Sequence, residues 1–260
     1  MTKVVLVIGS APEAVRAREF DTRHISQIVA INNAWRVRPD WTHLVHPEDF
    51  PEERRPLPAS GQRIITYEDY VPANNRFGGI VYAGGTMVFS AAYWVLDALK
   101  PDIMAFCGCD MIYDRRAGPS HFYGFGTADP LRSDPTLQSL EAKANRLAIM
   151  AAGKDCLCVN LSELPQSRLT FPRMAPALLR GSLAAVHCAG LARIRACIAE
   201  ATRAEVAALE TRQNIHVPTG DYWRQPGGLD AGILSSIDRL WLAALATPTS
   251  FGEIFPAPTA

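Results

Sequence analysis

The chain has 260 residues, of which 48% are hydrophobic and 20% charged, and its 26 Lys and Arg balance its 26 Asp and Glu. This is enough to bury one sizeable core. The zero net charge argues against nucleic acid or an acidic membrane as a partner, because both need a clustered basic excess. The basic doublets Arg54-Arg55 and Arg115-Arg116 are interpreted as solvated surface.

We expect a cytoplasmic protein with no transmembrane segment. Met1-Thr2-Lys3 leads into a strand-like segment without a signal-peptide pattern, and no apolar run reaches the roughly 18 residues of a spanning helix. The six cysteines fit this view as reduced thiols. Two Cys-x-Cys pairs each place both thiols on one face of a strand, where Cys packs as a small hydrophobe. Burial is therefore favoured over a metal site for Cys107, Cys109, Cys156 and Cys158, and we expect neither metal nor cofactor.

Strands and helices are predicted to alternate in the first two thirds of the chain. Residues 3–9 form a continuous apolar run ending in Gly, which is typical of a strand buried on both faces. A helical stretch at 12–19 follows. Apolar residues at helical spacing predict helices over 85–99 and 136–152, the latter opened by Asp134-Pro135. Further strands are predicted at 27–32, 41–46, 62–66, 102–107 and 155–160. This alternation predicts an α/β protein with a Rossmann-like, doubly wound, mostly parallel sheet.

The pattern changes after Leu164, so we predict a Rossmann-like domain over 1–164 and a helical C-terminal extension over 165–260. In the extension we predict one long helix from about 176 to 212, a loop from Pro218 to Gly228, a last helix near 229–246, and no strand. The extension is expected to cover the sheet, to form a lid, or to join two copies of the chain as a homo-oligomer.

Polar residues follow several predicted strands at their carboxyl ends, where open parallel sheets bind ligands. Amide, imidazole, hydroxyl and carboxylate groups at four successive strand ends predict a binding pocket. The residues are Gly9 and Ser10 after the first strand, Asn32 and Asn33 after the second, His46 after the third, and Asp110 and Tyr113 after the fifth, followed by the loop Ser120-His121-Phe122-Tyr123-Gly124. Gly85 and Thr86, at the start of the helix predicted over 85–99, are added as candidates.

For most of these groups two interpretations stay open. The turn at Gly9 and Ser10 either holds a phosphate on its backbone N–H groups or is a plain strand-to-helix turn. It lacks the dinucleotide and P-loop glycine fingerprints, so a standard NAD or ATP site is not expected. Asn32 and Asn33 either bind a base or sugar or form a turn. Likewise Gly85-Thr86 offers either close backbone approach or a helix cap.

Two residues are the main candidates for chemistry. His121, in a glycine-flanked loop beside Tyr123, is the predicted general acid or base, because imidazole titrates near neutral pH. Asp110 either orients an acceptor, binds a cation or caps a turn.

The order of these motifs resembles the bacterial sialyltransferases that use CMP-sialic acid and, more loosely, the Maf-type flagellin glycosyltransferases. The resemblance covers about residues 3–163. It rests on Gly9-Ser10-Ala11-Pro12, Asn32, His46-Pro47, Gly108-Cys109-Asp110 and Ser120-His121-Phe122-Tyr123-Gly124. It implies a Rossmann-like domain with a small lid, and a metal-independent transfer that inverts the anomeric centre.

The resemblance also implies roles. The first two strand ends would hold the nucleotide, tyrosines of the later loops would stabilise the leaving phosphate, and a histidine would deprotonate the acceptor hydroxyl. Several positions depart from the family's pattern. Phe125 stands at the position of the family's catalytic histidine, so either His121 has taken over, or the chemistry differs, or no sialyl transfer occurs. Ile112 replaces an expected tyrosine, although Tyr113 is adjacent, and Ser10 and His46 replace asparagines.

The leading hypothesis is therefore a glycosyltransferase that takes a sugar, such as a nonulosonate, from CMP or another nucleotide to a hydroxyl acceptor. A second is a metal-dependent (di)phosphotransferase resembling the pterin diphosphokinases, with Mg²⁺ on Asp110 and Asp114. A third is a non-catalytic nucleotide-binding protein. In the first hypothesis His121 is the base, Tyr113 and Tyr123 hold the leaving phosphate, and the nucleotide and its acceptor are the partners.

Overall fold

The computed structural model describes residues 2–113, 118–125 and 133–245. Its centre is one six-stranded sheet in which every pair of neighbours is parallel, in the order β4-β3-β2-β1-β5-β6. This confirms the predicted α/β, Rossmann-like fold. The strands are β1 (Val4–Ile8), β2 (Gln27–Ile31), β3 (His43–Val45), β4 (Arg63–Ile65), β5 (Ile103–Cys107) and β6 (Leu157–Asn160).

The sheet is built outward from β1, which is buried along its whole length. The register pairs Ile8 with Ala30 of β2 and with Cys107 of β5, so the three strands end at the same edge. The chain adds β2, β3 and β4 on one side of β1, then crosses back to add β5 and β6 on the other. The switch point thus lies between β1 and β5, where ligands of such sheets bind.

The connections between strands are mostly short helices. The chain also forms α1 and α2 at residues for which the sequence analysis predicted no element. Thr66 and Asp69 form a capping box that starts α1. In chain order these connections are η1 (Pro12–Glu19), η2 (Asn32–Arg36), η3 (Glu52–Arg54), α1 (Tyr67–Asn75), α2 (Ile80–Ala83), α3 (Met87–Trp94) with the π-helical turn η4 (Val95–Leu99), η7 (Pro135–Leu137) and α4 (Leu140–Ala152).

The prediction of a single helix over 176–212 is wrong, because one helix ends at Ala196 and the next begins at Glu200. At the break Ala199 donates its N–H to the carbonyl of Ala244, and Ile198 pairs with Leu245. Residues at the end of α7 therefore pair with backbone groups that would form hydrogen bonds within the helix if it were continuous. The extension consists of η8 (Pro176–Arg180), α5 (Ala184–Ala196), α6 (Glu200–Gln213), η9 (Tyr222–Arg224) and α7 (Ala231–Ala244), and the described part after Leu164 has no strand beyond isolated bridges.

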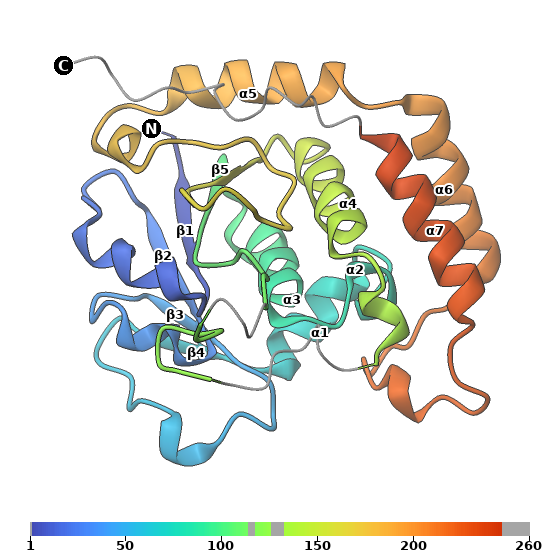
Figure 1. The fold of residues 1–260 in the computed structure, drawn as a ribbon, viewed down its shortest axis with the longest axis horizontal. Helices are drawn as coiled ribbons and strands as arrows, with labels where there is room; N and C mark the ends of the chain where they lie inside the picture. The colour runs from blue at the N-terminus through green and yellow to red at the C-terminus, as the bar shows by residue number, and fades with distance from the viewer. Residues whose placement is uncertain (1, 114–117, 126–132, 246–260) are drawn as a thin grey trace.

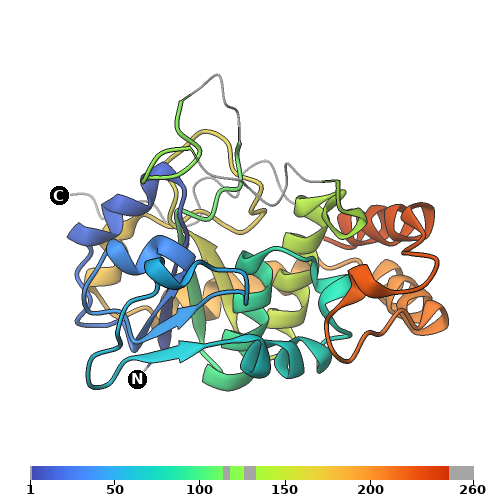
Figure 2. The same ribbon diagram turned by 90° about the horizontal axis from the view of Figure 1, so that it is seen from below.

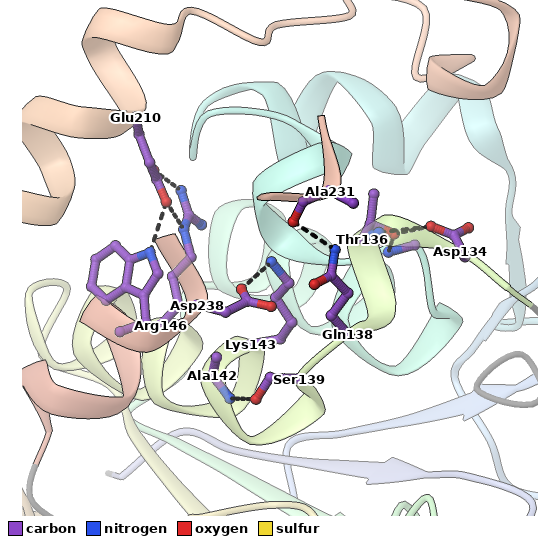
Figure 3. Close-up of polar contacts among 12 residues, drawn as sticks. Asp134, Thr136, Gln138, Ser139, Ala142, Lys143, Arg146, Glu210, Ala231 and Asp238 are labelled. Atoms are coloured by element: carbon purple, nitrogen blue, oxygen red, sulfur yellow. Dashed lines mark hydrogen bonds and ion pairs between the residues drawn. The ribbon is translucent and has the colours of Figure 1, made fainter. Parts of the chain in front are cut away.

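Figures 1 and 2 place α6 and α7 at the opposite end of the molecule from β2, β3 and β4. They are fastened to α4 by two buried ion pairs. Lys143 Nζ lies 2.8 Å from Asp238 of α7, and Arg146 forms hydrogen bonds of 3.0 and 2.8 Å with Glu210 of α6 (Figure 3). Trp241 of α7 is fully buried in the same hydrophobic core as β1 and β5. The core therefore continues across the boundary predicted at residue 164.

All four cysteines of the two Cys-x-Cys pairs are buried, as expected, and none of the six cysteines forms a disulfide. The expected placement of both thiols of a pair on one strand is wrong, because Cys109 lies beyond the end of β5 and Cys156 precedes β6. Among the described residues, no helix combines the length and the apolar character that crossing a bilayer requires.

Candidate functional site

Two glycines bring the ends of β1 and β5 into contact at the switch point. Gly9 donates its N–H to Cys107, and a Cβ atom at Gly9 would lie only 2.3 Å from the carbonyl oxygen of Gly108. Gly108 has a φ of +65°, and a Cβ there would lie 2.5 Å from that of Ala14. Glycine at both positions is thus required by close backbone approach. The backbones at the carboxyl ends of β1 and β5 are therefore closely packed against each other and against η1.

The loop Ser120–Gly124, here called the histidine loop, is hydrogen-bonded to the end of β1. Phe122 donates its N–H to the carbonyl of Ser10 at 3.0 Å, and His121 and Gly124 exchange two backbone hydrogen bonds of 3.0 Å. The His121 ring stacks on Tyr123 with 5.0 Å between ring centroids, and the Tyr113 ring lies 6.2 Å away. His121 Nδ1 is 2.8 Å from Ser120 Oγ. The imidazole is therefore fixed at one nitrogen and on one face.

The structure brings most of the predicted residues together around one cavity of about 90 Å³, here called the central cavity. Its lining draws on the ends of β1, β2 and β5, the start of α3 and the histidine loop. The predicted residues in this lining are Gly9, Ser10, Asn32, Thr86, Tyr113, His121 and Tyr123, and those that the sequence analysis missed include Ile31, Met87, Val88, Cys109 and Met111. These further residues are mainly apolar, and nothing in the sequence distinguishes them from ordinary core residues.

Besides Gly108, two non-glycine residues of the lining have left-handed backbone conformations. Asn32 has φ +51° and Met111 has φ +54°. Asn tolerates this region, but an unbranched side chain such as Met rarely adopts it. Such conformations cluster at functional sites, where the surrounding structure enforces them. The strain at Met111 is thus a second, independent mark of the same site.

Burial shifts the pKa of His121 and of Cys109 in this lining. Desolvation lowers the pKa of His121 below its usual 6.5, which favours a neutral ring that accepts a proton. Desolvation, with the nearby Asp110 charge, raises the pKa of Cys109 well above its usual value. The site therefore offers an imidazole base and an unreactive thiol.

Two larger hollows adjoin the central cavity. The Arg36 hollow, of about 710 Å³, shares Asn32, Met87 and Tyr123 with it; its other lining residues are Asn33, Arg36, Pro47, Asp49, Phe50, Pro51, Arg54 and Phe125. The Arg168 hollow, of about 570 Å³, shares Met111 and Tyr113 with it and is also lined by Ile112, Glu141, Arg173 and residues 165–168. Small-ligand pockets usually measure roughly 300–1,000 Å³. The central cavity is too small for a nucleotide, and each hollow is large enough.

The remaining predicted residues lie elsewhere. Asn33 lines the Arg36 hollow and not the central cavity. Gly85 donates to Thr136 and packs under the Tyr222 hydroxyl. His46 is buried, with Nδ1 2.8 Å from the carbonyl of Pro47, and burial lowers its pKa. Neither Gly85 nor His46 lines any of these three cavities.

Asp110 is 1% exposed, and in the described structure neither carboxylate oxygen has a hydrogen-bond partner. Its neighbours Cys109 and Met111 line the central cavity, but Asp110 itself lines none of the three. Asp114, the other acid of the predicted Mg²⁺ pair, lies outside the described residues. Within the described ranges no group of three or more His, Cys, Asp and Glu side chains is placed to hold a metal ion.

A larger cavity, of about 950 Å³, lies between α4, α6 and α7, away from the strand ends. Its central group, Arg146, already bonds Glu210, the Tyr93 hydroxyl and the Phe77 carbonyl. Because this charge is satisfied by the protein, volume alone does not make the cavity a binding site.

Comparisons of the chain with protein-family models, with curated proteins and with solved structures give no match.

Proposed function

We propose that this chain is a glycosyltransferase that moves a sugar from a nucleotide-activated donor to a hydroxyl acceptor without a metal ion. One observation carries the proposal: His121, Tyr113 and Tyr123 line the same cavity as Ser10 and Asn32, at the switch point of the sheet. A two-substrate transfer needs a base and hydrogen-bond donors where two binding regions meet. The small central cavity between two larger hollows fits that need.

In the proposed mechanism His121 takes the proton of the acceptor hydroxyl. Its Nδ1 is engaged with Ser120, which leaves Nε2 for the acceptor, and its lowered pKa keeps the ring neutral. The acceptor oxygen then forms a bond to the anomeric carbon while the bond from that carbon to the donor phosphate breaks. The Tyr113 and Tyr123 hydroxyls would donate hydrogen bonds to the leaving phosphate oxygens, which gain negative charge.

The departure at Phe125 is consistent with a base at position 121. Phe125 is 71% exposed and lines the Arg36 hollow, not the central cavity. His121, in contrast, is 7% exposed and packs against both tyrosine rings. Of the two positions, 121 is the one that contacts both tyrosine rings and lines the central cavity with them.

The test begins with binding. A thermal-shift screen with CMP, UDP, GDP and ATP, with and without Mg²⁺, detects any ligand that binds only the folded state. The preferred nucleotide is then supplied as its sugar conjugate, and the released nucleotide is measured for the wild type and for His121→Gln. Because general base catalysis contributes about 10²–10⁴-fold, we expect His121→Gln to lower turnover at least about 100-fold while the nucleotide affinity stays within about threefold.

The matched control is His216→Gln, since His216 is exposed and lines only the cavity beside α4 and α6. We expect it to turn over at the wild-type rate. Full activity of His121→Gln would refute the mechanism. Turnover that requires Mg²⁺ would instead favour the (di)phosphotransferase, and nucleotide binding without any turnover would favour a non-catalytic protein. No thermal shift with any nucleotide would contradict the proposed ligand class itself.

A further inference from the structure

The Arg36 hollow contains two guanidinium groups that have no acidic partner. In the part of the chain that the structure describes, neither Arg36 nor Arg54 forms a side-chain hydrogen bond or ion pair, whereas Arg55 donates to the carbonyls of Glu48 and Phe50. Both Arg36 and Arg54 are exposed, as the sequence predicted for Arg54, and both line the cavity of about 710 Å³ at the carboxyl end of the sheet.

Trp35 connects the two arginines. The guanidinium of Arg36 lies 5.4 Å from the centroid of the Trp35 ring, a cation–π contact. The indole N–H of Trp35 donates to the backbone carbonyl of Arg54 at 3.0 Å. One aromatic side chain therefore connects η2 and η3, which carry the two arginines of the hollow.

A buried amide in the same lining also lacks a partner. Asn33 is 3% exposed, and its buried Oδ1 accepts no hydrogen bond. An unsatisfied buried oxygen costs about 1–3 kcal/mol, so a native structure that keeps one needs a reason. Asn32, shared with the central cavity, has the same unpartnered Oδ1. Both side chains line the hollow, and their buried oxygens become available to the N–H or O–H groups of a ligand when the amides turn toward it.

The charges and rings of the hollow narrow the ligand class further. Two arginines face one acid, Asp49, which leaves the lining one positive charge in excess. Phe125 and Tyr123 are 71% and 38% exposed and offer flat apolar surface. Guanidinium groups match phosphate oxygens in geometry, and exposed aromatic rings stack on bases.

From these contacts we propose that the Arg36 hollow binds the phosphate groups of a nucleotide through Arg36 and Arg54, and prefers a nucleoside diphosphate to a monophosphate. The preference follows because two separate guanidinium groups match the extra charge and oxygens of a diphosphate. This inference rests on the proposed function, because the nucleotide is the one that carries the donor sugar. It goes further by stating how many phosphate groups the site recognises.

The experiment measures the affinities of cytidine, CMP, CDP and inorganic pyrophosphate by calorimetry at fixed ionic strength, with UMP and UDP as a second base. For the wild type we expect about a tenfold gain from CMP to CDP, and pyrophosphate binding on its own. Arg36→Ala and Arg54→Ala should each lose most of that gain and weaken pyrophosphate about tenfold. Cytidine affinity should change less than threefold in both variants.

The control Arg212→Ala removes the same charge from an exposed position of α6 that lies outside the hollow. It should leave all affinities unchanged. Equal binding of CMP and CDP, or a gain that survives both arginine substitutions, would overturn the inference. The proposed function fails separately: arginine-dependent pyrophosphate binding without His121-dependent turnover would keep the phosphate subsite and reject the transferase.

Discussion

His121 is held by contacts of different kinds: a side-chain contact to Ser120, backbone hydrogen bonds to Gly124 and a stacked Tyr123 ring. These contacts fix the orientation of the ring, and burial in the loop removes water that would stabilise its charged form. The same physical cause lowers the pKa of His43 and His46, which lie on and just after β3. Burial in the folded structure therefore favours the neutral form of all three imidazoles.

This arrangement predicts a pH-dependent stability. Because the folded pKa values of His43, His46 and His121 lie below the usual 6.5, the unfolded chain binds more protons as the pH falls through 6.5. The free energy of unfolding should therefore decrease as the pH falls below 6.5, whereas these three groups do not lower it above that pH. Urea unfolding at constant ionic strength should give a lower midpoint at pH 5.5 than at pH 7.5.

The variant His121→Gln should reduce the difference between the two midpoints, since it removes one of the three groups. The matched substitution His216→Gln, at an exposed position, should leave the difference unchanged. A midpoint at pH 5.5 equal to or above that at pH 7.5 would contradict the assignment of these histidines as neutral in the folded protein.

Among the elements, α4 connects the sheet to the C-terminal helices. Its apolar side chains enter the core beside β6, while Lys143 and Arg146, one turn apart, reach α7 and α6. Lys143 is fully buried and Asp238 is 4% exposed at the side chain. Burying two charges is costly, but removing only one of them costs more, because the other is left without a partner.

We therefore expect Asp238→Asn to lower the free energy of unfolding by about 3–5 kcal/mol, as for other broken buried pairs. The double substitution Lys143→Met with Asp238→Leu should recover most of this loss, since it removes both charges. As a surface comparison, Asp155→Asn breaks the exposed pair with Arg195 and should cost less than about 1 kcal/mol. Chemical denaturation of the four proteins measures these differences. A loss for Asp238→Asn no larger than that for Asp155→Asn would contradict the role of the buried pair.

The elements that the sequence predicted well are those whose pattern is set by their own burial. The strand at Val4–Ile8 is apolar throughout because both faces are covered, and the predicted and observed bounds nearly agree. The break at Ile198 was missed because it depends on the end of α7, more than forty residues later in the chain. An Ala-rich helical pattern contains no local signal for that contact.

The site was predictable to a similar degree. Glycine, amide and histidine positions at strand ends pointed to the central cavity, because parallel strands end at one edge. Arg54 is exposed, as the basic doublet predicted, but nothing in the sequence indicated that it would also line a hollow while Arg55 turns toward backbone carbonyls. His46 follows a strand as predicted, but its ring turns onto the carbonyl of Pro47, and nothing in the local sequence indicates that rotamer.

At the scale of the whole molecule, the residues after 164 complete the core. Trp241, Leu234 and Ile237 of α7 are fully buried against the α/β part, and Gly190 of α5 packs so closely on β6 that a Cβ would lie 2.4 Å from Leu157. The hydrophobic effect is worth roughly 25 cal/mol for each Å² of apolar surface buried. Exposing this interface would remove a large part of the small net stability of a folded domain.

This continuity predicts that residues 1–164 alone do not fold cooperatively. The fragment would expose the apolar face of α4 and leave Lys143 and Arg146 buried or half-buried without Asp238 and Glu210. We expect it to show no sigmoidal thermal transition by circular dichroism and to bind a dye specific for exposed apolar surface. A chain of residues 1–245, which keeps every described contact, should melt in one transition close to that of the full chain. A cooperative transition in the 1–164 fragment would instead show that the sheet and the C-terminal helices are separate folding units, and that the buried ion pairs merely join them.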